Sequence, residues 1–215
     1  MCDVTDEQSV GELMRAATSG GDRVRTVVHT TGVSPQMGKP DLIVRINALG
    51  TVNIARAFLP LAQEGDSLVN VASYAGHAAP GFLIPARAFP LAETNPARFV
   101  RTLVRRAGVV GRKQHSGFAY ALSKAYVIWY SERLAAGFGA RGARVVSVSP
   151  DTSPAPTSWS TAERVPVDGT AEAARSDPPC HLVLSASEHR KAKTGRPLRA
   201  STSGRVCPAR GITAG

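Results

Sequence analysis

Three stretches of the sequence combine continuous apolar residues with β-branched side chains, and they constrain the fold more than any other feature. They lie at residues 25–33 (RTVVHTTGV), 67–73 (SLVNVAS) and 143–150 (ARVVSVSP). Apolar runs of this kind are typical of strands that are buried on both faces of a sheet. Segments with helical periodicity, at residues 41–62 and 116–139, separate the three runs. The alternation predicts an open parallel α/β sheet, whose ligands bind at the carboxyl ends of the strands.

The composition is that of an ordinary globular chain. A length of 215 residues with 43% hydrophobic residues suits a single domain with a sizeable core. We expect no apolar run to reach membrane-spanning length, and the acidic start is not a signal peptide, so we expect a cytoplasmic protein. The three cysteines are odd in number and far apart, which indicates reduced thiols, and the five histidines lack metal-ligand spacing. We therefore expect no metal site.

Positive charge is concentrated in residues 77–117, where seven Arg or Lys stand against Glu93 alone, in a chain of net charge +10. Such a patch can attract an anionic cofactor, an acidic substrate or nucleic acid. However, residues 95–108 (NPARFVRTLVRRAG) have the pattern of an amphipathic helix, and no aromatic residues alternate with the arginines. We interpret the patch as a solvated helix face and do not expect nucleic-acid binding.

Residues 118–126 (FAYALSKAY) place Tyr120 and Lys124 four positions apart within a predicted helix. On a helix this spacing puts the two side chains on one face, about 5–6 Å apart at Cβ. Nearby positive charge favours the ionised form of a phenol, which makes tyrosine a better proton donor and acceptor near neutral pH. The pair also arises by chance, so by itself it is weak evidence for a catalytic site.

Six elements in the same order resemble the short-chain dehydrogenase/reductase family, from Cys2 to about Pro150. Tyr120-Ala-Leu-Ser-Lys124 resembles the Tyr-x-x-x-Lys motif of the active-site helix. SLVNVASYAG resembles the strand that ends in the catalytic serine, and INALGTVN resembles the helix that carries the structural and proton-relay asparagine. The resemblance therefore implies the catalytic residues Tyr120, Lys124, Ser73 and Asn47.

The same resemblance implies an NAD or NADP cofactor. Cys2-Asp3-Val4 resembles the strand end that contacts the adenine ring, HTTG at 29–32 stands where the family usually has Asn-Asn-Ala-Gly, and VSVSP resembles the strand and proline beside the nicotinamide. The cofactor-binding residues so implied are Asp3, Val4, Thr30, Thr31, Gly32, Tyr120, Lys124 and Pro150. Taken singly, three of the residues have simpler explanations: Ser73 as a strand-end cap, Asn47 as a polar residue inside a helix, and Asp3 as part of the next helix start.

By this resemblance, the reaction interconverts a secondary alcohol and a ketone. Tyr120 would exchange a proton with the substrate oxygen while hydride moves to or from the nicotinamide, and Ser73 would bind that oxygen. The family also implies a homodimer or a homotetramer. Ser73 and Tyr120 are 47 positions apart, much farther than in most members. The long insert is similar to that of the 3α-hydroxysteroid dehydrogenase/carbonyl reductase and coniferyl-alcohol dehydrogenase group, which implies a hydrophobic, steroid-like substrate. PLAETNP at 90–96 also resembles the sugar-epimerase and dehydratase branch, but VSVSP does not.

Both ends of the sequence depart from the family pattern. The family begins with a strand and a Gly-rich turn that holds the pyrophosphate, and here Met1 stands two residues before Asp3. We therefore expect a Rossmann-like doubly wound parallel sheet that lacks its first strands, with a basic helical insert at 77–117 and no readable choice between NAD and NADP. The alternative is a truncated, inactive chain without a complete dinucleotide site.

Residues 151–215 differ in composition from residues 1–150, and we predict a domain boundary between them. The second segment contains seven of the fifteen prolines and few large apolar residues, so it can bury little surface. We expect a loosely ordered tail in which only residues 181–186 (HLVLSA) form a strand or begin a helix. Our hypothesis is that this tail comes from a shifted reading frame or a fusion, and that Met1 is an internal start.

Overall fold

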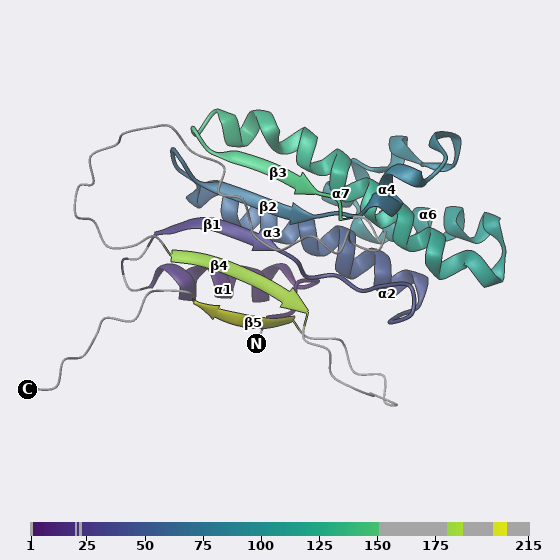
Figure 1. Ribbon diagram of the computed structural model, residues 1–215, viewed down its shortest axis with the longest axis horizontal. Coiled ribbons are helices and arrows are strands. Elements are labelled where there is room, and N and C mark those ends of the chain that lie inside the picture. The colour runs from purple at the N-terminus through teal and green to yellow at the C-terminus, as the bar shows by residue number, and fades with distance from the viewer. Residues whose placement is uncertain (1, 20, 22, 151–179, 187–199, 206–215) are drawn as a thin grey trace, which may run out of the picture.

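The computed structural model describes residues 2–19, 21, 23–150, 180–186 and 200–205. Its centre is a five-stranded sheet with the order β3-β2-β1-β4-β5 (Figure 1). The first four strands in this order are parallel, and β5 is antiparallel to β4. The predicted Rossmann-like parallel α/β arrangement is confirmed. The strands are β1 (Val24–His29), β2 (Ser67–Val71), β3 (Arg144–Val148), β4 (Cys180–Ala186) and β5 (Ala200–Arg205).

One long helical run connects β1 to β2, where the sequence predicted a helix over residues 41–62. It consists of α2 (Pro40–Val44), the π-helical segment η1 (Arg45–Leu49), α3 (Gly50–Phe58) and the 3₁₀ turn η2 (Leu59–Leu61). Gly50 keeps the run close to the N-terminal segment, because a Cβ atom at this position would lie 2.9 Å from Cγ2 of Val4. The π-helical segment carries Asn47, and such segments are frequent at functional sites.

The helices lie in one layer on one face of the sheet. Helix α1 (Glu7–Thr18) packs against α3, α2 packs against α7 (His115–Gly139), and both α3 and α7 contact the strands. Figure 1 shows the strands in front of α1 and α3. Within the part of the chain that the structure describes, α3 and α7 make the main contacts between this layer and the strands. The alternation of strand and helix in the sequence therefore becomes a two-layer arrangement.

The start of α1 differs from the prediction. The residues Thr5-Asp6-Glu7-Gln8 have the pattern of a capping box, which predicts Thr5 as the capping residue. Instead, Asp6 caps the helix by accepting a hydrogen bond from the backbone N–H of Gln8. Thr5 instead donates from its backbone N–H and its hydroxyl to Oδ1 of Asp3, at 2.9 and 2.8 Å. The Thr5 hydroxyl is thus directed at Asp3 within the turn, and the Asp6 carboxylate supplies the capping acceptor.

The segment between β2 and α7 is largely helical. In α6, the Asn95 side chain accepts from the backbone N–H of Arg98, and the apolar stripe of the helix is buried, as the amphipathic pattern predicted. The helices and turns of this segment are α4 (Tyr74–Ala78), η3 (Gly81–Leu83), η4 (Ala86–Ala88), α5 (Leu91–Thr94), α6 (Pro96–Ala107), η5 (Gly108–Val110) and η6 (Arg112–Gln114).

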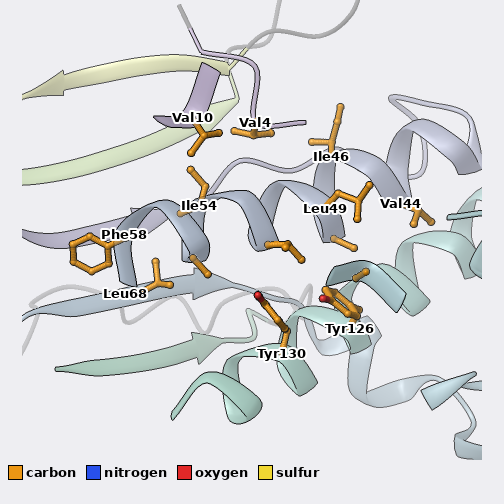
Figure 2. Close-up of a cluster of buried hydrophobic side chains, with 14 of the residues drawn as sticks. Val4, Val10, Val44, Ile46, Leu49, Ile54, Phe58, Leu68, Tyr126 and Tyr130 are labelled. Atoms are coloured by element: carbon orange, nitrogen blue, oxygen red, sulfur yellow. The ribbon is translucent and has the colours of Figure 1, made fainter. Parts of the chain in front are cut away.

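The main core lies between the long helical run, the sheet and α7. Ile54, Phe58 and Leu68 are fully buried, and Figure 2 shows Tyr126 and Tyr130 of α7 in the same cluster. Burial raises the pKa of both phenols, and the neighbouring Glu93 carboxylate adds to the effect. Both tyrosines therefore stay protonated, and Tyr130 donates to Oε1 of Glu93 at 3.1 Å. These two phenols stabilise the core and do not resemble acid–base groups.

The run Pro40–Leu61 corrects the expectation that no segment is long and apolar enough to cross a membrane. Its 22 residues have a mean hydropathy of 1.4, which suffices by length and composition alone. However, 67% of this segment is buried inside the protein, where its side chains pack against β2, α1 and α7. The run is therefore explained as the central core helix of the α/β layer.

Two strands come from the C-terminal part of the chain. Residues 181–186, which the sequence predicted as a strand or a helix start, lie in β4 beside β1. Strand β5 was not predicted, because its sequence ASTSGR lacks an apolar run. The loosely ordered tail was predicted for residues 151–215, of which residues 151–179, 187–199 and 206–215 lie outside the described residues.

Candidate active site

Helix α7 brings Tyr120 and Lys124 together, as their spacing predicted. The Lys124 ammonium lies 5.7 Å from the centre of the Tyr120 ring, and Nζ donates to the backbone carbonyl of Val71 at 2.7 Å. Val71 is the last residue of β2, so the pair sits at the carboxyl end of a parallel strand. This edge is where ligands bind in open α/β sheets.

Lys124 is buried, with only 6% of its surface exposed. Burial lowers the pKa of its ammonium from 10.5 to about 8, because a charged group loses favourable hydration in the interior. The amine can therefore gain or lose a proton near neutral pH. A partly buried phenol one helical turn away is within reach of its electrostatic influence.

Ser73 lies directly beyond the end of β2 and is 8% exposed. Its hydroxyl accepts from the backbone N–H of Ala75 at 3.3 Å and so caps α4, which matches the simpler explanation of this residue. Helix α4 approaches α7 closely because residue 76 is glycine. A Cβ atom at Gly76 would lie 2.8 Å from the backbone N of Ala125 and from the backbone carbon of Lys124. Helix α4, which Ser73 caps, therefore packs directly against the turn of α7 that carries Lys124.

Asn47 links the π-helical segment to two other parts of the candidate site. Its Oδ1 accepts from the backbone N–H of Val33 at 2.8 Å, and its Nδ2 donates to the Val33 carbonyl and to Oγ of Ser123, both at 3.1 Å. Ser123 in turn donates to the backbone carbonyl of Tyr120 at 2.7 Å. Asn47 is 1% exposed. Its side chain therefore ties the loop after β1 to the helix that carries Tyr120.

The loop after β1 contacts the catalytic candidates. A Cβ atom at Gly32 would lie 3.2 Å from Oδ1 of Asn47 and 3.5 Å from Nζ of Lys124. Thr31 is 5% exposed, and its hydroxyl has no partner among the described groups. Thr30 precedes it and is partly buried. Of the predicted cofactor residues, Thr30, Thr31 and Gly32 therefore stand at the same strand edge as Lys124.

The remaining predicted cofactor residues lie in two places. Pro150 is exposed, and its carbonyl accepts from the backbone N–H of Tyr74 at 3.1 Å, which places it beside Ser73. Asp3 holds the turn before α1, as its simpler explanation proposed, and Val4 is buried with its carbonyl accepting from Asn53 at 2.8 Å. Pro150 therefore lies at the Ser73 end of the site. Asp3 and Val4 lie elsewhere: the backbone N–H of Asp3 donates to Ser9 in α1, and Val4 accepts from Asn53 in α3.

Two buried polar residues at this edge were not identified from the sequence. His29 and Asn70 are 3% and 0% exposed and face each other across β1 and β2. Alternation along each strand places both on the inward face, together with Val27 and Leu68. This alternation is the feature of the sequence that could have identified His29 and Asn70 as buried. Their adjacency depends on the register of two strands 41 positions apart, which the local pattern does not specify.

The N-terminal part of the sequence matches a protein-family model. Residues 1–83 match the model described as Enoyl-(Acyl carrier protein) reductase. A comparison with curated proteins gives no match.

The fold is similar to that of the 3-alpha-hydroxysteroid dehydrogenase from Pseudomonas sp. B-0831, whose structure was solved in complex with NADH. The TM-score is 0.58 at 20% sequence identity, over 70% of this chain and 57% of that enzyme. At this identity the likeness establishes a shared fold. It spans little more than half the length of the hydroxysteroid dehydrogenase.

Two further solved structures give lower TM-scores. A short chain dehydrogenase from Mycobacterium smegmatis has a TM-score of 0.48 at 21% identity, over 70% of this chain and 52% of that protein. An enoyl-(acyl-carrier-protein) reductase from Anaplasma phagocytophilum, in complex with NAD, has 0.47 at 17% identity, over 69% and 48%. The fold assignment rests on the hydroxysteroid dehydrogenase.

The described residues offer groups that fit one end of a dinucleotide better than the other. At the nicotinamide end, the Thr31 hydroxyl and the Lys124 ammonium offer donors beside Gly32, whose missing side chain lets Asn47 and Lys124 lie close to the loop. At the pyrophosphate end, a Gly-rich turn should connect a strand to a helix start. Residues 137–142 do have the pattern G-x-G-x-x-G. However, this turn connects the end of helix α7 to the start of strand β3, whereas a pyrophosphate-binding turn connects a strand to a helix. Among the described residues, donors therefore gather at the carboxyl ends of β1 and β2, and the G-x-G-x-x-G sequence does not precede a helix.

Proposed function

We propose that this chain carries the proton-transfer site of an NAD(P)-dependent oxidoreductase that interconverts a secondary alcohol and a ketone. The observation that supports it is the placement of the Lys124 ammonium 5.7 Å from the Tyr120 ring, at the carboxyl end of parallel strand β2. The bound nicotinamide would supply or accept the hydride. The protein would supply binding, orientation and the proton.

Each of the four predicted catalytic residues has a distinct task in this proposal. The Tyr120 hydroxyl gives its proton to the substrate oxygen during reduction and takes it back during oxidation. The Lys124 ammonium stabilises the phenolate that forms, and the Ser73 hydroxyl donates to the substrate oxygen where charge develops. Asn47 holds the loop after β1 against α7 and so keeps Tyr120 and Lys124 in position. Thr31, Gly32 and Pro150 would contact the nicotinamide end of the cofactor.

The substrate class follows from the resemblance to the hydroxysteroid dehydrogenase group. We propose a hydrophobic, steroid-like alcohol or ketone, and a homodimer or homotetramer in the cytoplasm, as expected for the family. The exposed arginines of α6 remain a solvated face in this proposal, since Arg98, Arg101 and Arg105 point to the surface. Arg106 differs, because its guanidinium donates to the carbonyl of Leu83 at 2.9 Å and supports the fold.

A thermal melt of the purified chain with and without NADH or NADPH tests cofactor binding. A ligand that binds only the folded state raises the midpoint, and at one hundred times its Kd the gain is about 2.7 kcal/mol. We expect one of the two cofactors to raise the midpoint. A chain that keeps the fold but binds no dinucleotide is the second candidate, and it is favoured by the reversed context of the G-x-G-x-x-G sequence. It predicts a cooperative melt that neither cofactor shifts.

Activity is tested by following NADH oxidation or NAD reduction with a panel of ketosteroids and hydroxysteroids. Tyr120→Phe should lower kcat by about 10²- to 10⁴-fold, because it removes the proton donor. It should keep the cofactor-induced shift of the melting midpoint. Tyr130→Phe is the matched control, because it removes a hydroxyl from the same helix at a residue that bonds to Glu93 in the core. Equal activity of Tyr120→Phe and wild type would refute the assigned role.

A further inference from the structure

The inward-facing end of β1 carries a buried histidine whose ring has no partner. His29 is 3% exposed, and neither Nδ1 nor Nε2 has a hydrogen-bond partner among the described groups. A neutral imidazole has one donor and one acceptor, and buried polar groups are almost always paired. His29 is the last residue of β1 and follows the fully buried Val27 on the same face. Its ring therefore points into the helix-covered side of the sheet.

Asn70 presents a second unpartnered atom on the neighbouring strand. The register of the parallel pair sets His29 opposite Asn70, and adjacent strands lie about 4.8 Å apart. The Nδ2 of Asn70 donates to Oγ of Ser131 at 3.0 Å, which fixes the orientation of the amide. Oδ1 is then left as a buried acceptor without a donor among the described groups. An acceptor on one strand thus faces an imidazole on the next.

Lys124 brings a donor to the same place. Its Nζ donates to the carbonyl of Val71, which is the residue after Asn70. Nζ also lies 3.5 Å from where a Cβ atom would be at Gly32, which is three residues after His29. The ammonium therefore sits between the ends of β1 and β2. An ammonium has three N–H donors, so Nζ has donors beyond the one directed at Val71.

We propose that an internal water molecule is held between His29, Oδ1 of Asn70 and Nζ of Lys124, and that His29 is thereby a positioning residue for the lysine. The water accepts from one N–H of Lys124 and donates to Asn70 Oδ1 and to the unprotonated ring nitrogen of His29. These three bonds match the usual number for a buried water. The arrangement pairs the Asn70 acceptor and one nitrogen of the imidazole.

The electrostatics agree with this geometry. Burial, together with the nearby Lys124 charge, lowers the pKa of His29 to about 3, so the ring stays neutral and keeps an acceptor. The titratable groups that the structure places beside Lys124 are His29 from β1 and Tyr120 from its own helix. Asn70 of β2 precedes Val71, to which Lys124 is bonded, and Asn47 of η1 lies at Gly32; both side chains are uncharged. The water would therefore solvate an ammonium that has no anionic partner among these residues.

The consequence for catalysis rests on the proposed function, whereas the water site itself does not. By solvating the ammonium, the water would hold Nζ in place and favour its charged form. Replacing His29 with an apolar residue of similar size should remove one of the three bonds. The pKa of Lys124 should then fall further, because its ammonium loses solvation.

The test is an NMR titration of the full-length chain with ¹⁵N-labelled lysine, in which the Lys124 signal is assigned by its loss in Lys124→Met. We expect His29→Phe to lower the Lys124 midpoint by about one pH unit or more. His29→Asn should keep the wild-type midpoint, because its amide oxygen can still accept from the water. A folded His29→Phe protein with an unchanged midpoint would overturn the proposal.

A second measurement keeps the proposal testable if His29→Phe does not fold. A high-resolution crystal structure of the wild-type chain should show a water bonded to His29, Asn70 and Lys124. A direct bond from the His29 ring to Asn70 Oδ1, with no water between them, would overturn it. Neither measurement requires NADH binding or activity. Failure of the proposed function would appear as an unshifted melt with NADH and NADPH, while the titration stayed readable.

Discussion

The two faces of the sheet have similar sequences and very different surroundings. On the helix-covered face, Val27 and Leu68 are fully buried beside His29 and Asn70. On the opposite face, Val146 and Val148 are 46% and 49% exposed. We refer to Val28, Val69, Val71, Val146 and Val148 of this opposite side as the valine face.

The valine face follows from strand register. Val28 pairs with Val69, which pairs with Val146, and Val71 pairs with Val148, so valines stand side by side across three strands. Ser67 and Thr26 share this face, since their hydroxyls are bonded at 3.2 Å. Continuous apolar strands are typical of sheets covered on both faces. The described residues supply helices for one face, and the candidate site is built entirely on that face.

Leu68→Ala should reduce stability more than any substitution on the valine face. Leu68 is fully buried in the core between β2 and the helices, so truncation removes apolar contacts and leaves a cavity. We expect a loss of about 3–4 kcal/mol in the free energy of unfolding. Urea denaturation followed by circular dichroism measures it. A loss below about 1 kcal/mol would mean that the helix-covered face is not the main core.

The sequence predicted the helix-covered face well because its signals are local. Apolar runs marked the strands, and helical periodicity marked the long run from Pro40 and α7. The spacing of Tyr120 and Lys124 sufficed to place both on one helix face, since helical geometry relates residues four apart. The apolar runs at residues 25–33 and 67–73 also predicted where β1 and β2 end, and so placed Gly32 and Ser73 at these strand ends.

Features that depend on contacts between distant segments were not predictable in this way. The π-helical turn at Asn47 has no local signal that separates it from the helical pattern on either side, and the pairing of His29 with Asn70 requires the strand register. The capping of α1 by Asp6 accompanies a turn in which Asp3 accepts from Thr5 and Asp6 accepts from the backbone N–H of Gln8. Strand β5 forms by pairing with β4 despite its polar sequence.

Lys124, the buried lysine of the helix-covered face, should have a smaller effect on the free energy of unfolding, and this effect should be confined to alkaline pH. The pKa of Lys124 is about 8 in the folded chain, against 10.5 for the ordinary amine. Between these values the unfolded chain binds the proton and the folded chain does not, so stability rises with pH. Below pH 8 both states bind it, and the cost of burying the charge is fully present.

Wild type should therefore gain about 2–3 kcal/mol of stability from pH 8 to pH 10 relative to Lys124→Met, which lacks the titrating group. Denaturation curves of both proteins at several pH values measure the difference. The comparison with the variant is needed because Tyr126 and Tyr130, whose pKa values are raised by burial, act in the opposite direction at higher pH. Parallel pH profiles of the two proteins would show that Lys124 is not buried as a charge.

Val146→Ala should have the smallest effect, and it is the sharpest test of the difference between the faces. Val146 lies in β3 with 46% of its surface exposed, so truncation removes few contacts and opens no enclosed cavity. We expect a loss of less than about 1 kcal/mol, part of it from the lower strand propensity of alanine. The same urea denaturation that measures Leu68→Ala measures this variant. Losses of equal size at the two positions would show that the valine face is covered in solution, and that the sheet has a second packed layer on that side.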